Sequence, residues 1–241
     1  MKVFLSLVAL VAVCYAPARP LAQDASRARR AAPQARERGD VLKLIAKLKD
    51  KNQQVANEAA GALAELGEEA APHLEHVLSS EKGAPVLVLA ALALGEIKPE
   101  HPSVVETLVR VARGRNTFDS EETLTARRTA GMLLARTPAG IRALPALLKD
   151  DDNFVRRSAA FALDDPTEVI DNLTPAQLEA VGEVLPALVA ALDDADEVVR
   201  GMSCEVLGQI VRSETGTLGT KAEKLLKERN KSRGDCLCEC E

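Results

Sequence analysis

A short pattern recurs five times along the chain, and it constrains the fold more than any other feature. Residues 155–163 align without a gap on residues 199–207, with Val followed by Arg at the start of both. The pattern also starts at Val55, Val86 and Ala126, so successive starts are 31, 40, 29 and 44 residues apart. Periods of this size are typical of two-helix repeats, which bury their apolar faces only by stacking on one another.

Each repeat places its apolar residues on one face of a predicted helix. Counted from the starting residue, positions 0, 4, 7, 8 and 11 fall on the same side of a helix with 3.6 residues per turn. Position 5 carries only small residues, which let neighbouring helices approach closely. These residues are Ala60, Ala91, Gly131, Ala160 and Cys204. We therefore expect Cys204 to be a buried core residue.

Polar turns and prolines predict where the helices begin. Before each patterned helix lies a turn with candidate N-cap side chains, at residues 50–52, 79–80, 119–120, 150–153 and 193–196. A second apolar helix precedes each turn, and proline is expected to open four of these. The prolines are Pro72, Pro102, Pro145 and Pro186. Two capping boxes are predicted, Ser103 with Glu106 and Thr174 with Gln177. A charged helix around residues 221–229 is expected to cap the end of the stack.

Composition favours helices and disfavours two other classes. The chain is 46% hydrophobic but only 2% aromatic and has no Trp, so Ala, Leu and Val carry its apolar volume. A β-sandwich or barrel would need more aromatic and β-branched residues in its strands. The formal charge of -5, together with the shortage of aromatic platforms for bases, argues against nucleic acid as a partner.

The N-terminus has the pattern of a secretory signal peptide. Lys2 is followed by an uncharged apolar run over residues 3–16, which is short for a transmembrane helix. We expect a signal peptide over 1–22, a flexible basic linker over 23–39, a repeat domain over 40–230 with Asp40 as its first N-cap, and a Cys-rich disordered tail over 231–241. The protein is then exported, periplasmic or secreted, with no integral membrane segment after signal removal. The alternatives are a lipoprotein anchored at Cys14 and an N-terminal helix that is retained.

The two strongest repeats, at residues 144–156 and 185–200, resemble HEAT-like repeats of the phycocyanobilin-lyase type. The resemblance covers about residues 40–212. It implies an all-α, right-handed α-α superhelix, a HEAT/armadillo-like solenoid of about five two-helix repeats. It also implies contacts between repeats that involve an acid in the turn and an Arg six residues later. The pairs with this spacing are Glu121 and Arg127, Asp150 and Arg156, and Asp194 and Arg200.

The residues give no pattern of a reaction centre, so we expect no catalysis and no cofactor. The candidates for a metal site are Cys236, Cys238 and Cys240, which alternate in an acidic tail. Three thiolates so close together suit a soft metal ion. They could equally form disulfides between chains in an oxidising compartment, or the tail could have no particular role.

A solenoid offers an extended concave surface, so we expect this chain to be a scaffold that binds another protein or a peptide there. The alternatives are a lyase-like protein or lyase subunit of the bilin-lyase HEAT family, and metal binding through the tail cysteines. The predicted binding residues lie on the outward face of the second helices, at positions 2, 6 and 10. They are Leu92, Arg128, Met132, Arg136, Arg157 and Phe161. The competing interpretation is that Leu92 and Phe161 pack between helices as core.

Overall fold

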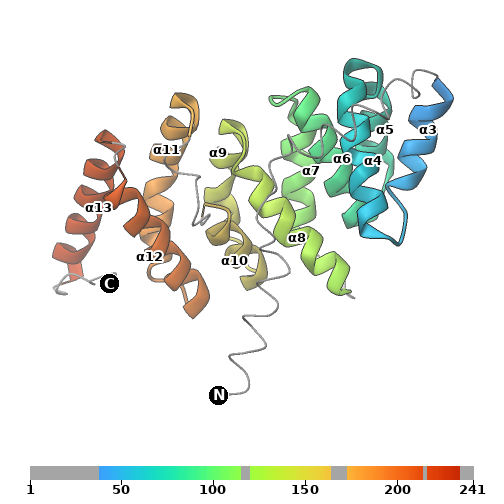
Figure 1. The fold of residues 1–241 in the computed structure, drawn as a ribbon. Helices are drawn as coiled ribbons and strands as arrows, with labels where there is room; N and C mark the ends of the chain where they lie inside the picture. Colours follow the sequence, from blue (N-terminus) through green and yellow to red (C-terminus); the bar gives the residue numbers. More distant parts are fainter. Residues whose placement is uncertain (1–37, 115–119, 164–172, 214–215, 234–241) are drawn as a thin grey trace. The chain divides into compact units, whose positions relative to one another are not determined.

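The structure, a computed structural model, describes residues 38–114, 120–163, 173–213 and 216–233 (Figure 1). Over these ranges the chain forms eleven α-helices and one short 3-10 helix, and no strand is found in them. The predicted signal peptide, most of the predicted linker and the three tail cysteines lie outside the described residues. None of the helices in the described ranges is long and apolar enough to cross a membrane.

The chain divides into two compact units between His73 and Leu74. In the first unit, α3 (Arg38–Lys47) packs against α4 (Gln53–Leu66), which is followed by the 3-10 helix η2 (Gly67–Glu69). Because α3 already begins at Arg38, Asp40 lies in its first turn, and the prediction that Asp40 is the N-cap is wrong. An acid in the first turn still favours the helix, since it faces the positive end of the helix dipole.

The second unit is a two-layer stack of helices. Its members are α6 (Ala84–Ile97), α7 (Pro102–Arg113), α8 (Glu121–Leu134), α9 (Pro138–Leu147), α10 (Asn153–Phe161), α11 (Pro175–Ala191), α12 (Glu197–Arg212) and α13 (Thr217–Arg233), while α5 (Ala71–Ser80) spans the boundary between the units.

In one layer, which we call the A layer, α7 contacts α9, α9 contacts α11 and α11 contacts α13. In the other, the B layer, α6, α8, α10 and α12 contact one another in the same sequential way. Figure 1 shows α9 and α11 above α10 and α12. Each B helix is one of the patterned helices of the sequence, so the predicted all-α solenoid of two-helix repeats is confirmed.

Small residues form the contact surface of the B layer, as the pattern predicts. In the second unit, position 4 carries Ala90, Ala130, Ala159 and Ser203, and all four are buried. At position 5, Ala91, Gly131 and Ala160 are buried as well.

Cys204 is an exception at position 5, because it is only half-buried, and it is disulfide-bonded. The prediction that it is a buried core residue is therefore wrong. The physical reason is that no further B helix follows α12 in the described part of the chain, so nothing in this layer covers its position 5.

In four of the five repeats, the predicted turn supplies the N-cap residue of the patterned helix. The side chains of Asn52, Ser120, Asp152 and Asp196 each accept a hydrogen bond from a backbone N–H in the first turn of the following helix. In the second repeat the cap is Gly83, because the predicted turn at residues 79–80 instead forms the last residues of α5.

Helix starts in the A layer differ more from the prediction. Pro102 opens α7, and the capping box of Thr174 and Gln177 is confirmed. The box of Ser103 and Glu106 is wrong, since the N-cap of α7 is His101.

Two of the prolines expected to open helices lie inside them. Helix α9 begins at Pro138 and α11 at Pro175, so Pro145 and Pro186 are interior residues. An interior proline cannot donate to the carbonyl four residues earlier. In α11 this carbonyl belongs to Gly182, and it accepts a hydrogen bond from Lys221 Nζ of α13 at 2.6 Å instead. Helix α13 contacts both α11 and α12, and its own Leu218 and Ala222 are buried, as predicted for a helix that covers the last repeat.

Candidate protein-binding face

Two turns of the B layer share one hydrogen-bonding scheme. In the turn before α10, Asp150 accepts from the Asp152 N–H at 3.1 Å, and Asp152 accepts from the Phe154 N–H at 2.9 Å. In the turn before α12, Asp194 accepts from the Asp196 N–H at 2.8 Å, and Asp196 caps the helix. Each turn thus presents two carboxylates in a fixed arrangement toward the preceding repeat.

Arginines of α10 bind both carboxylates of the turn before α12. Arg156 donates to the two oxygens of Asp194 at 2.8 and 3.0 Å, and Arg157 donates to Asp196 Oδ2 at 2.6 Å. Burial acts to raise the pKa of Asp194, but the hydrogen bonds from Arg156 and the Asp196 N–H, together with the charge of Arg156, lower it overall. The hydrogen bond from Arg157 lowers the pKa of Asp196 to about 2. Both acids therefore stay ionised and hold α12 against α10.

Between α8 and α10 the corresponding contact is made by a buried arginine. Arg127 is only 3% exposed, and its guanidinium donates to Asp152 Oδ2 at 2.7 Å and to the Ala112 carbonyl at 3.2 Å. The same group lies 4.5 Å from the centroid of the Phe154 ring, a cation–π geometry. Burial acts to raise the pKa of Asp152, but hydrogen bonds from Arg127 and the Phe154 N–H lower it overall.

The expected acid–arginine contacts between repeats are therefore present, with one correction. Arg127 and Arg156 each reach the turn of the next repeat, while Arg156 and Arg200 also donate to backbone carbonyls of their own turns. Glu121 does not take part, because it is the first residue of α8 rather than a turn residue.

The sequence interpretation missed Asp152 and Phe154 as partners of Arg127. The repeated Asp-x-Asp spacing before α10 and α12 was the signal that could have identified the second Asp of each turn as an inter-helix partner.

Helices α8 and α10 approach each other very closely. A Cβ atom placed on Gly131 would lie 2.9 Å from the Ser158 carbonyl oxygen, so only glycine fits there without a shift of the backbone. Met132 is the next residue after Gly131, and Phe161 lies about one helical turn beyond Ser158. Met132 and Phe161 thus lie on neighbouring helices of the same layer, each close in sequence to the point where these helices meet.

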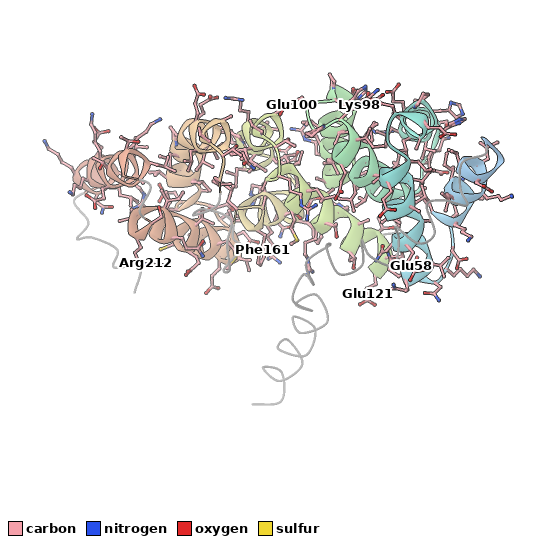
Figure 2. All side chains as sticks on the ribbon, turned by 45° about the horizontal axis from the view of Figure 1, so that its top comes forward. Glu58, Lys98, Glu100, Glu121, Phe161 and Arg212 are labelled. Carbon is pink, nitrogen blue, oxygen red and sulfur yellow. The ribbon has the colours of Figure 1, made fainter. Side chains whose placement is uncertain are left out.

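Met132 and Phe161 are exposed, as predicted for a binding face. Met132 is 52% exposed and Phe161 is 37% exposed, and with Leu42 and Val198 they are the large hydrophobic side chains exposed in the described ranges. Phe161 projects from the same side of the second unit as Arg212 at the end of α12, whereas Lys98 and Glu100 lie on the other side (Figure 2).

Two arginines lie near Met132 in the sequence, one on α8 and one in the turn that follows this helix. Arg128 precedes Met132 by four residues, so these two side chains share one column of the helix surface, and Arg136 follows two residues after the end of α8. Arg128 and Arg136 are exposed, and neither forms a hydrogen bond or ion pair through its side chain with another residue of the described chain. We call the surface of Arg128, Met132, Arg136 and Phe161 the α8–α10 face.

The other two predicted binding residues are less available. Leu92 is half-buried, and the guanidinium of Arg157 is bound to Asp196. At the corresponding position of α12 stands Glu205, which pairs with Arg212 at 3.7 Å. The apolar part of the face therefore ends at α10.

A separate pocket of about 440 Å³ lies beside the turns that precede α10 and α12. Its lining includes Asp150, Asp151, Asp193, Asp194 and Arg156. Asp150 and Asp194 already accept hydrogen bonds within their turns. Across the described residues, no group of three or more His, Cys, Asp or Glu side chains is placed to hold a metal ion.

Comparison with known proteins supports repeats of the HEAT kind. The model of the HEAT repeat matches residues 184–213, which are the second half of α11 and helix α12. No curated protein matches the sequence. The resemblance to the phycocyanobilin-lyase type stays a prediction.

Among solved structures, a designed armadillo repeat protein in complex with the peptide (KR)4 is 20% identical, with a TM-score of 0.43, over 79% of this chain and 92% of that chain. A computationally designed armadillo repeat protein for modular peptide recognition is 18% identical, with a TM-score of 0.35, over 77% and 98%.

Proposed function

We propose that the protein is a non-enzymatic scaffold that binds another protein or a peptide through the α8–α10 face. The observation that carries the proposal is the pair Met132 and Phe161, exposed at the same repeat position of two helices in close contact. Exposed large apolar side chains at the centre of a rigid surface are typical of interaction sites. The Arg–Asp contacts at the N-terminal ends of α10 and α12 hold these helices against the preceding ones, and a surface formed before a partner arrives favours binding.

Peptide selection on the purified full chain tests this proposal. A displayed library of random 12-residue peptides is selected against the protein, and dissociation constants of the selected peptides are measured by fluorescence anisotropy. We expect the double substitution Met132→Ser and Phe161→Ser to weaken binding at least about tenfold, since each change removes an apolar anchor. The matched control is Val198→Ser, which alters an equally exposed apolar residue of α12 outside the face.

The folded state of each variant is checked by thermal unfolding. We expect the double variant to keep most of its stability, because both side chains are already exposed to solvent. Unchanged affinity of the selected peptides for the folded double variant would contradict the proposed face. A large loss of stability would show that both side chains are core residues, and the face would have to be withdrawn.

The proposal includes export, which the apolar run at residues 3–16 after Lys2 supports. Intact-mass measurement of the protein produced in a secretory host tests it. We expect a mass that lacks about the first 22 residues. A mass that includes residues 1–16 would contradict export with cleavage, and a diacylglycerol on Cys14 would indicate the lipoprotein alternative.

A further inference from the structure

Cys204 forms a disulfide whose partner lies outside the described residues. The chain has five cysteines, and Cys204 is the one that the described ranges contain. Of the other four, Cys14 belongs to the predicted signal peptide, and three lie in residues 234–241, which we call the C-terminal tail. The tail follows directly on α13, so the course of this helix decides whether the tail reaches Cys204.

Cys204 occupies the repeat position that faces the next B helix. On α8 the same position is Gly131, where an added Cβ atom would lie 2.9 Å from the Ser158 carbonyl oxygen of α10. On α10 the position is Ala160, which is completely buried. No B helix follows α12 within the described ranges, and Cys204 is only half-buried. It thus faces the place that a further B helix would occupy.

The course of α13 brings the chain close to that place. Helix α11 leads through residues 192–196 into α12, and α13 has the same length as α11, 17 residues, and contacts both of these helices. Near its end, Arg229 donates to the carboxylate of Asp193 in the turn before α12. The chain therefore leaves α13 near the N-terminal end of α12, where the turn before a further B helix would begin.

The tail is long enough to reach Cys204 from there. Cys204 lies seven residues after Glu197, the first residue of α12, which is about 10 Å along the helix axis. An extended chain advances about 3.3 Å per residue, so the stretch from the end of α13 to Cys240 spans up to about 23 Å. The tail cysteines alternate with other residues, and alternate residues of an extended segment project to the same side.

The surface of α12 around Cys204 suits a close backbone approach. Gly201 precedes Cys204 by three residues and Gly208 follows it by four, so the three residues share one face of the helix. A Cβ atom placed on Gly201 would meet no other atom of the described chain within 4 Å. This face is therefore open and carries small residues, as the facing surfaces of α8 and α10 do at Gly131.

We infer that the C-terminal tail lies extended along this face of α12 and is bound there by a disulfide between Cys204 and a tail cysteine. The tail then covers the end of the B layer, as α13 covers α11. The bond closes a loop of at least 32 residues, which stabilises the fold by restricting the unfolded chain.

Formation of this bond requires an oxidising partner. Two thiols are oxidised to one disulfide, while a disulfide donor of the compartment is reduced to two thiols. Disulfides persist in oxidising compartments, so the pairing agrees with the proposed export. It does not depend on the α8–α10 face.

Peptide mapping without reduction tests the pairing in the full chain purified from a secretory host. Free thiols are blocked with iodoacetamide, and trypsin then cleaves after Arg200, Arg212 and Arg233, which separates residues 201–212 from the tail. We expect these two peptides to be joined, and the intact protein to have the mass of a single chain. A blocked Cys204, a link to the peptide of Cys14, or a link found only in covalent dimers would each overturn the inference.

Melting temperatures show whether the bond supports the fold. Cys204→Ser, and separately the change of all three tail cysteines to Ser, should lower the melting temperature equally, by about 5 °C or more, because each removes the same bond. All four changes together should lower it no further, and dithiothreitol should lower that of the unmodified protein by the same amount. The matched control, Cys14→Ser, should leave it unchanged. Additive losses from the two variants, or no loss from either, would overturn the inference.

Discussion

The guanidinium of Arg127 donates to the carboxylate of Asp152 at 2.7 Å, although Arg127 is almost completely buried. The contact joins the middle of α8 to the N-cap of α10, so one carboxylate both begins a helix and binds its neighbour. Breaking a buried ion pair by removing one partner is costly, because the remaining charge keeps its desolvation penalty. This pair therefore couples the formation of α10 to its packing on α8.

Substitution of Asp152 tests that coupling. We expect Asp152→Ala to lower the free energy of unfolding by about 2–4 kcal/mol, because it leaves Arg127 buried without its carboxylate and removes a helix cap. Asp152→Asn keeps the cap and should isolate the contribution of the charge. The matched control is Asp196→Ala, which removes an equivalent cap whose partner Arg157 is 43% exposed, and we expect a smaller loss. Urea denaturation measures all three; equal losses for the two Ala variants would show that burial of Arg127 is unimportant.

The lowered pKa of Asp196 predicts how stability depends on pH. Arg157 holds this pKa at about 2 in the folded state, below the ordinary 3.8, so the folded protein releases its proton more readily than the unfolded chain. The resulting stabilisation is present above about pH 4 and is lost as the pH falls from about 4 to about 2.

The pKa values of Asp152 and Asp194 are also lowered, so they add to the loss in the same direction. Urea midpoints between pH 7 and pH 2 should therefore fall less steeply for Arg157→Gln than for the unmodified protein. Arg128→Gln changes an arginine with no bound carboxylate and should follow the unmodified protein. Parallel curves for all three proteins would contradict the contribution of the Arg157–Asp196 pair.

Lys221 and Pro186 should be energetically coupled. Because Pro186 has no N–H, the Gly182 carbonyl depends on Lys221 Nζ, and we expect Lys221→Met to cost about 1 kcal/mol of unfolding free energy. In a Pro186→Ala background the backbone N–H returns and the same change should cost less. The control is Lys224→Met, since Lys224 is 76% exposed and its loss should change stability by less than about 0.5 kcal/mol. A double-mutant cycle with no coupling would show that the lysine does not replace the missing helix hydrogen bond.

Periodicity was sufficient to predict the solenoid and much of its surface. The buried stripe at position 4, and at position 5 of every patterned helix except α12, follows from where a residue falls on a regular helix. The caps Ser120, Asp152 and Asp196 and the exposure of Met132 and Phe161 follow in the same way. Such properties depend on neighbours within about one helical turn, so the order of residues along the chain contains them.

Helix starts were less predictable where a second residue could serve the same purpose. Pro145 and Pro186 suit a helix start as well as Pro138 and Pro175 do. The choice between them was made by packing, since the longer α11 buries Ala180, Val181 and Val184 ahead of Pro186.

The partners of the arginines were decided by the tertiary structure alone. Arg127-Arg128 and Arg156-Arg157 occupy the same repeat positions, and each pair is followed one repeat later by an Asp-x-Asp turn. On α10 both arginines bind a carboxylate of that turn, but on α8 only Arg127 does. The reason is that Arg113, at the end of α7, lies 3.1 Å from Asp150 and occupies the first carboxylate. Arg127 then binds the second carboxylate, that of Asp152, and Arg128 stays exposed on the same helix as Met132. Which charges remain for a partner thus depends on competition between side chains far apart in the chain, and a repeat pattern does not contain that information.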